Sequence, residues 1–389
     1  MHCRLKFDIG WRSLLWATAG PPVRKARADR ASLKLRQHFH QGTAVAGLSV
    51  RTIFDALLSE LALPGGSTVL MSGVNVQNMA DIVRQHQLEV RGVDIDLERL
   101  SPAAGALLDA QHDTGAQLCV VAHLFGSTNR ISDAARLRER GVFVVEDAAQ
   151  AFAAPYRGCT ETDVTLYSFG PIKRCTALGG GVAVFQNADL AARVQARLDT
   201  YPQRSDIWYR RRALKYLVLK ALSTPLAFAA LHRSLAWLGR DPDEFLGGIA
   251  RGFSGPSLVE ALRARAPARL LALLAAQVTR TDDSSTRAEL CREVLDGLPK
   301  GVRLGDAADT HAYWVLPVLA ADPDSVVASL RRAGFDATRG ATSLRALSPT
   351  DTPVATRLMA NIVYVPHPIA LDRHTRDRLR MAMAEALVS

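Results

Sequence analysis

The middle of the chain alternates short apolar runs with amphipathic stretches. Segments such as NMADIVRQHQ (78–87) and ISDAARLRER (131–140) place apolar residues three and four apart, which predicts helices. The apolar runs between them are rich in Val, Ile, Leu and Phe and predict strands at 68–72, 89–96, 117–125, 141–149, 163–169 and 180–185. Strands that alternate with helices predict an α/β fold with a mainly parallel sheet, covered by helices on both faces.

The pattern changes on either side of this region. Residues 187–240 read as helical and basic, whereas the C-terminal part has predicted strands at 312–320 and 362–367 and a final amphipathic helix, which is typical of a small α+β domain. The length of 389 residues favours two domains. We therefore expect an N-terminal arm at 1–45, a large domain at 46–240 with a basic helical insertion at about 200–240, and a small domain at 241–389.

Composition excludes several classes of protein. Hydrophobic residues make up 48% of the chain and charged residues 22%, as in ordinary globular proteins. The five cysteines are an odd number without CxxC spacing, which argues against a disulfide framework or a zinc site and favours the reducing cytoplasm. No metal site is expected. The most apolar segment, 213–238, is interrupted by Lys215, Lys220 and Pro225, so no transmembrane helix is predicted.

The net charge of +10 is concentrated at residues 1–40 and in YRRRALKYLVLK at 209–220. Such clusters bind nucleic acid, membrane surfaces or anionic substrates, or are ordinary solvated helix faces. No nucleic-acid-binding motif accompanies them, so we expect no nucleic-acid partner. Trp208, Tyr216 and Trp237 lie among these cations, which favours either contact with the inner membrane surface or packing in a dimer interface.

Four polar residues mark the predicted carboxyl ends of neighbouring strands. Asp147 and His123 end two of the strands, and Ser168 and Lys173 lie at and after the end of a third. Ligands of parallel sheets bind at this edge. A lysine beside a carboxylate suits pyridoxal phosphate, because the amine forms a Schiff base and the carboxylate pairs with the pyridinium nitrogen. The plain alternatives are a surface lysine, a turn aspartate and a buried structural histidine.

The stretches VVEDAAQAFAAPYRG and DVTLYSFGPIKRCTALGGGVAVF resemble the DegT/StrS family of fold-type I pyridoxal-phosphate aminotransferases. The likeness extends back through AHLFGS, VDIDLERL and LALPGGSTVL, and forward more faintly to THAYWVLPV and YVPHPI. It covers roughly residues 45–190 well and 300–389 less well, and the middle does not match.

By this resemblance Lys173 is the Schiff-base lysine and the catalytic residue, and Asp147 is the partner of the pyridinium nitrogen. The other cofactor contacts that it implies are Gln150 near the ring, His123 behind it, and Ser168, Arg51 and Thr52 at the phosphate. Members with histidine in place of the lysine act as dehydratases, so Lys173 favours transamination.

The resemblance implies a homodimeric cytoplasmic enzyme that converts a ketone or aldehyde to an amine. A nucleotide-linked keto sugar is the expected type of acceptor, and glutamate or glutamine the expected donor. Arg339 and His367 are candidates for contact with an anionic or polar substrate group. One alternative is a lipid-like or secondary-metabolite carbonyl substrate. Another is a catalytically silent scaffold, suggested by Val50 and Val76, which replace a phosphate-loop glycine and a ring-stacking aromatic of the family.

Overall fold

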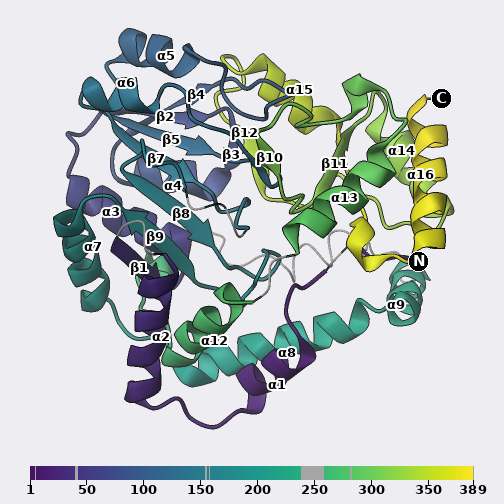
Figure 1. The fold of residues 1–389 in the computed structure, drawn as a ribbon, viewed down its shortest axis with the longest axis horizontal. Helices are drawn as coiled ribbons and strands as arrows, with labels where there is room; N and C mark the ends of the chain where they lie inside the picture. The colour runs from purple at the N-terminus through teal and green to yellow at the C-terminus, as the bar shows by residue number, and fades with distance from the viewer. Residues whose placement is uncertain are drawn as a thin grey trace.

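A seven-stranded sheet forms the centre of the large part of the molecule (Figure 1). The computed structural model describes residues 1–4, 6–39, 43–153, 156, 158–237, 258–280 and 283–388. The strand order is β1-β9-β8-β7-β5-β2-β4. The bounds are β1 Thr43–Gly47, β2 Thr68–Ser72, β4 Glu89–Val93, β5 Leu118–Ala122, β7 Phe143–Asp147, β8 Val164–Ser168 and β9 Gly181–Phe185. Only β9 runs against the other strands, antiparallel to both of its neighbours β8 and β1, which confirms the predicted mainly parallel α/β fold.

Helices cover both faces of this sheet because successive strand residues point to opposite sides. On one side Val145 and Leu166 pack in one core with α3 (Val50–Leu61), α4 (Gln77–Gln85) and α7 (Ala188–Thr200). On the other side Cys119 and Val144 pack in a second core with α5 (Ala106–Thr114) and α6 (Ala134–Glu139). The sheet is therefore buried on both faces, as its near-continuous apolar strands require.

The β1 and β8 end of the sheet is covered by helices from distant parts of the chain. They are α1 (Trp11–Ala19), α2 (Lys25–His38), α8 (Asp206–Leu222) and α12 (Ala268–Val278). The predicted basic insertion forms α8 and α9 (Pro225–Trp237), and the short α11 (Leu258–Leu262) lies near α3. Within the described residues no single helix is long and apolar enough to cross a membrane; α8 and 225–231 pass that test only as a pair bent by 95°.

The C-terminal part has a core of its own, which begins at Ala288. It contains the antiparallel pair β11 and β13 with three helices packed around it. The bounds are α13 Ser284–Leu295, η1 Lys300–Val302, β11 Leu316–Leu319, α14 Pro323–Arg332, α15 Pro353–Asn361, β13 Ile362–Val365, η2 Pro368–Ala370 and α16 Arg373–Val388. The predicted boundary at 240/241 lies outside the described residues, and α12 packs with the large part.

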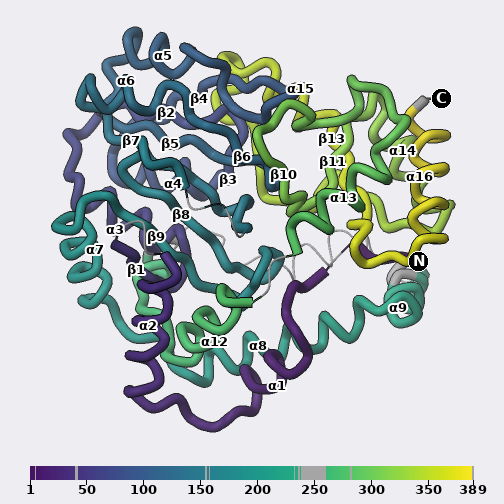
Figure 2. Tube along the Cα trace, in the orientation of Figure 1, coloured from purple at the N-terminus to yellow at the C-terminus, as the bar shows by residue number. Residues whose placement is uncertain are grey.

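The two parts are joined by short strand pairs and by the N-terminus. β3 (Val74–Val76) pairs with β12 (Leu344–Ala346), and β6 (Ser127–Thr128) pairs with β10 (Thr310–His311). The first residues lie beside the C-terminal part and the chain then runs to α1 below the sheet (Figure 2). There His2 N–H donates to Gly334 O at 2.8 Å, and Asp336 N–H donates to His2 O at 3.0 Å. The predicted arm therefore bridges both parts.

One buried arginine holds the helices below the sheet together. Arg269 of α12 is fully buried and donates to both carboxylate oxygens of Asp206 on α8, at 2.7 and 3.1 Å. Its remaining N–H groups donate to Trp16 O at 3.1 Å and Pro21 O at 3.0 Å. A planar guanidinium satisfies all these acceptors at once, which an ammonium cannot do.

We expect Arg269→Lys to lower the free energy of unfolding by about 2 kcal/mol, because buried acceptors lose their donors. Urea denaturation followed by circular dichroism measures it. Arg193→Lys is the control, since Arg193 is exposed and lies 3.5 Å from Glu60, a type of pair worth less than about 1 kcal/mol. Equal stability of the two variants would contradict the role given to Arg269.

Candidate active site

Lys173 lies in a tightly held loop between β8 and β9. Its backbone N–H donates to Gly170 O at 3.0 Å. The hydroxyl of Thr176 donates to Gly170 O at 2.6 Å and accepts from Leu178 N–H at 2.8 Å. Cys175 and Leu178 have positive φ angles of 48° and 61°, an uncommon conformation for residues with side chains. The loop therefore holds local strain of the kind found at functional sites.

The amine of Lys173 is shielded by the C-terminal part. Its Nζ atom lies 3.5 Å from the ring centroid of Trp314, and the indole N–H of Trp314 donates to Ile172 O at 2.7 Å. Burial lowers the pKa of Lys173 to about 7; Asp147 acts against this shift and Arg51 adds to it. The lowered pKa increases the uncharged fraction of the amine at neutral pH, and the uncharged amine is the form that acts as a nucleophile.

Asp147 ends β7 and interacts electrostatically with this amine. Its side chain is buried and accepts a hydrogen bond from Ala149 N–H at 3.0 Å. Burial raises the pKa of Asp147, whereas the charges of Lys173 and His123 lower it. A buried carboxylate needs a cation or donors nearby. The structure thus brings together the two residues on which the sequence interpretation depends.

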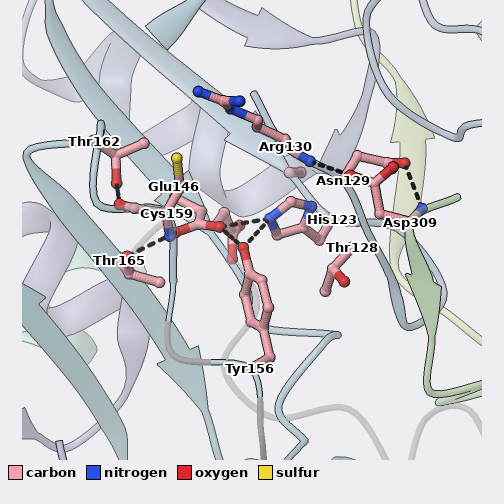
Figure 3. Close-up of polar contacts among 12 residues, drawn as sticks. His123, Thr128, Asn129, Arg130, Glu146, Tyr156, Cys159, Thr162, Thr165 and Asp309 are labelled. Carbon is pink, nitrogen blue, oxygen red and sulfur yellow. Dashed lines mark hydrogen bonds and ion pairs between the residues drawn. The ribbon is translucent and has the colours of Figure 1, made fainter. Parts of the chain in front are cut away.

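Glu146, the residue before Asp147, points to the other side of the strand into a closed polar cluster (Figure 3). It is fully buried and accepts from His123 Nε2 at 2.7 Å, Cys159 N–H at 2.8 Å, Thr165 Oγ1 at 2.7 Å and the hydroxyl of Tyr156. These donors satisfy the charge of Glu146. Nε2 of His123 is directed toward Glu146 in this cluster. We therefore assign His123 the role of a positioning residue.

Gln150 connects this edge of the sheet to the segment that carries Trp314. Its Oε1 accepts from Phe125 N–H at 2.9 Å, and Trp314 N–H donates to Phe125 O at 2.9 Å. Gly126 has φ of 102°, and a Cβ there would lie 2.5 Å from Trp314 N. Only glycine allows this close approach. Gln150 therefore supports the loop against which Trp314 is placed.

The start of α3 lies against the glycine triplet. Ser49 caps the helix by accepting from Thr52 N–H at 3.1 Å, and Gly180 N–H donates to Leu48 O at 2.8 Å. A Cβ on Gly181 would lie 2.4 Å from Val50 N, so glycine is required there to leave the first amides of α3 in place. Amides at a helix start attract phosphate groups.

The hydroxyl of Thr52 differs from the prediction. It donates to Leu262 O at 3.0 Å, and its oxygen lies 2.9 Å from Ser49 Oγ. Its single proton is therefore already used, and Thr52 cannot donate to a phosphate in this arrangement. Ser168, at the end of β8, makes no hydrogen bond to another described side chain and remains a candidate donor.

Two arginines meet near the start of α3. Burial and the charge of Arg212 lower the pKa of Arg51 to about 10, and Arg51 in turn lowers that of Lys173. Arg212 of α8 donates to Leu178 O within the lysine loop. Like charges held this close favour a bound anion. Arg212 was not predicted, although the YRRR run was a signal for it.

Pyridoxal phosphate fits these residues. Lys173 offers a near-neutral amine for its aldehyde, and Asp147 offers a buried carboxylate for its ring nitrogen. The start of α3, with Arg51, Arg212 and the close approach at Gly181, suits its phosphate.

Known proteins share this sequence region and this fold. The family model described as the DegT/DnrJ/EryC1/StrS aminotransferase family matches residues 24–209. The UDP-4-amino-4-deoxy-L-arabinose–oxoglutarate aminotransferase of Shewanella sediminis is 28% identical over 186 residues. That match spans 46% of this chain and 46% of the relative, less than half of either protein.

Two solved structures cover almost the whole chain. The aminotransferase TlmJ from Streptoalloteichus hindustanus has a TM-score of 0.72 at 18% identity and covers 100% of this chain and 99% of its own. The sugar aminotransferase CalS13 from Micromonospora echinospora has a TM-score of 0.70 at 19% identity, with coverages of 99% and 100%. These likenesses show the fold. The family match contains Asp147, Ser168 and Lys173, so the part of the chain that resembles the DegT/DnrJ/EryC1/StrS aminotransferase family includes the candidate site.

Proposed function

We propose that the protein is a pyridoxal-phosphate-dependent aminotransferase that works through Lys173. The observation that carries the proposal is an amine of pKa about 7 beside a buried carboxylate, at the carboxyl ends of β7 and β8. An ordinary lysine is almost fully protonated at neutral pH and is a poor nucleophile. The match of residues 24–209 to the aminotransferase family model supports the same activity.

Each residue at the site has a definable task. Pyridoxal phosphate, when bound, supplies an aldehyde and a ring that withdraws electrons. Nζ of Lys173 moves a proton as a base of suitable pKa. Asp147 keeps the ring nitrogen protonated, while Arg51 and Ser168 bind the phosphate. The ring of Trp314 lies against Nζ.

The substrate that we propose is a nucleotide-linked keto sugar, with glutamate or glutamine as donor. The sugar-nucleotide name of the Shewanella relative and the cationic site of this chain support that class. A lipid-like carbonyl substrate is the alternative. It is favoured by the exposed apolar residues of α1 and α8.

The first test is an absorbance titration with pyridoxal phosphate, followed by borohydride reduction and peptide mass spectrometry. We expect a visible absorbance band and a reduced cofactor fixed on Lys173, and neither in Lys173→Ala. Lys300→Ala, at an exposed lysine of η1, is the matched control and should behave as wild type. Failure of the wild-type chain to bind the cofactor would favour the silent scaffold.

The pH dependence of Lys173 is a second test. Only the uncharged amine reacts with acetic anhydride, so its acylation should rise as pH increases through about 7 and then level off. Asp147→Asn removes the charge that holds the pKa up, so the rise should move to lower pH. Trace labelling read by mass spectrometry measures both curves. A rise that continues toward pH 10 would refute the lowered pKa.

We also propose that the enzyme is a homodimer and that an apolar face on α1 and α8 contacts an anionic membrane surface. On α8, Ile207, Leu214 and Val218 are 62, 49 and 50% exposed, and on the packed helix α1 the exposed residues are Trp11 and Leu15. Exposed cations, Arg12, Arg211 and Lys215, lie on the same two helices. Two such basic faces repel each other, whereas anionic lipid attracts them.

Co-sedimentation with vesicles that contain anionic lipid tests this surface. The wild-type protein should bind, and binding should fall by about tenfold or more in the double variant Leu214→Glu, Val218→Glu. Met381→Glu, at an exposed apolar residue of α16, is the control and should still bind. If the wild type does not bind vesicles and the double variant changes a dimer to a monomer in light scattering, the face is the interface between two copies.

A further inference from the structure

A cavity lies beside Lys173, on the side of the C-terminal part. Its walls come from the N-terminal arm, the lysine loop, α13 and the β11–β13 pair. Lys173, Trp314, Lys6 and Arg287 all line it. Part of the lining is apolar and includes Leu316 and Val365. A ligand that reacts at Lys173 can therefore extend toward two cations.

Arg287 is the best-defined of these cations. It is 4% exposed, and its Nη2 atom donates to Tyr313 O at 3.2 Å. Its Nε atom is buried and has no hydrogen-bond partner among the described residues. A buried guanidinium N–H without an acceptor is unfavourable. An acceptor in the cavity would satisfy it.

Lys6 adds a second charge from the arm. Burial and the charge of Arg287 lower the pKa of Lys6 to about 8, against the opposite effect of Asp8 and Asp283. Lys6 makes no ion pair with a described residue. Arg287 and Lys6 therefore repel each other across the cavity, and an anion between them would remove this repulsion.

The other charged groups of the cavity are already balanced. Arg174 pairs with Asp283, and Arg4 pairs with Asp336. Asp8 accepts from Cys175 N–H at 2.7 Å, which ties the arm to the lysine loop. These contacts fix the wall but leave Lys6 and Arg287 without a carboxylate of their own among the described residues. The cavity has an excess of positive charge.

The two substrate contacts expected in the C-terminal part behave differently. His367 lines the cavity, but its Nε2 donates to Tyr313 O at 2.8 Å and its Nδ1 accepts from Ile369 N–H at 3.2 Å. Both ring nitrogens make hydrogen bonds within the protein, so His367 is part of the cavity wall and does not offer a contact to the substrate. Arg339 pairs with the exposed Asp324 instead.

We propose that Lys6 and Arg287 form an anion subsite for a carboxylate or phosphate group of the compound that reacts at Lys173. The inference rests on the proposed function, because it assigns a substrate group to that site. It also explains why the arm crosses to the C-terminal part, since residues 1–23 precede the family match at 24–209. The ligand class is a small anion with a short apolar portion between its charge and its reacting group.

Isothermal titration calorimetry with glutarate and with inorganic phosphate tests the subsite on the full chain. We expect one probe to bind, and its affinity to fall by about tenfold or more in Lys6→Gln and in Arg287→Gln. Arg287→Lys should retain part of the affinity because it keeps the charge. Glutarate binding alone indicates a carboxylate as the natural group, and phosphate binding alone indicates a phosphate.

Lys25→Gln, at an exposed lysine of α2, is the matched control and should bind as wild type. Thermal unfolding separates binding from folding. Lys6→Gln removes a repulsion, so the melting temperature of this variant should stay the same or rise while its affinity for the anion falls. If Lys6 had only a structural role, the substitution would lower both the melting temperature and the affinity. Absence of binding by the wild type, or unchanged affinity in Lys6→Gln, would overturn the subsite.

Cofactor trapping on Lys173 keeps the two proposals apart. If the cofactor is trapped but Lys6→Gln binds both probes like wild type, the subsite is wrong and the proposed function stands. If an anion binds through Lys6 but no cofactor is trapped, the anion site stands and the aminotransferase activity fails.

Discussion

The burial of Lys173 beside Asp147 is the constraint on which the rest of this structure depends. In water both groups would be charged, and the lysine would be a weak nucleophile. Removing water lowers the pKa of the amine to about 7 and raises that of the carboxylate, while their attraction limits both shifts. A strained loop, the Trp314 ring and the close packing at Gly126 and Gly181 all help to hold the surroundings of this pair in place.

Two adjacent carboxylates on β7 have different tasks because a strand turns successive side chains to opposite faces. Asp147 faces Lys173, whereas Glu146 faces His123, Thr165 and the loop at Cys159. Glu146 is satisfied by donors within the protein and holds three segments together. Asp147 keeps free capacity for a ligand. Of these two adjacent residues, Glu146 therefore anchors neighbouring segments and Asp147 is available for the chemistry of the site.

The N-terminal arm joins elements that the sheet alone does not connect. Lys220 of α8 donates to Ile9 O, Asp8 accepts from the lysine loop, and His2 pairs with Phe335 of the C-terminal part. The arm is thus placed by contacts at three points along its length. These contacts bring Lys6 to the cavity beside Lys173. A segment that lies outside the family match is therefore next to the candidate active site.

The sequence by itself determined the parallel sheet and the edge at which Asp147 and Lys173 lie, because hydrophobic periodicity and the alternation of strands with helices along the chain are local properties. It missed β1, and it did not single out Trp314, Arg212, Lys6 or Arg287 as neighbours of the site. It also did not indicate that the hydroxyl of Thr52, a predicted phosphate contact, donates to Leu262 O. These features depend on contacts between residues more than a hundred positions apart, such as Thr52 with Leu262 and Ile172 with Trp314. Only tertiary packing decides such contacts, since no local pattern specifies which distant side chain fills a given space.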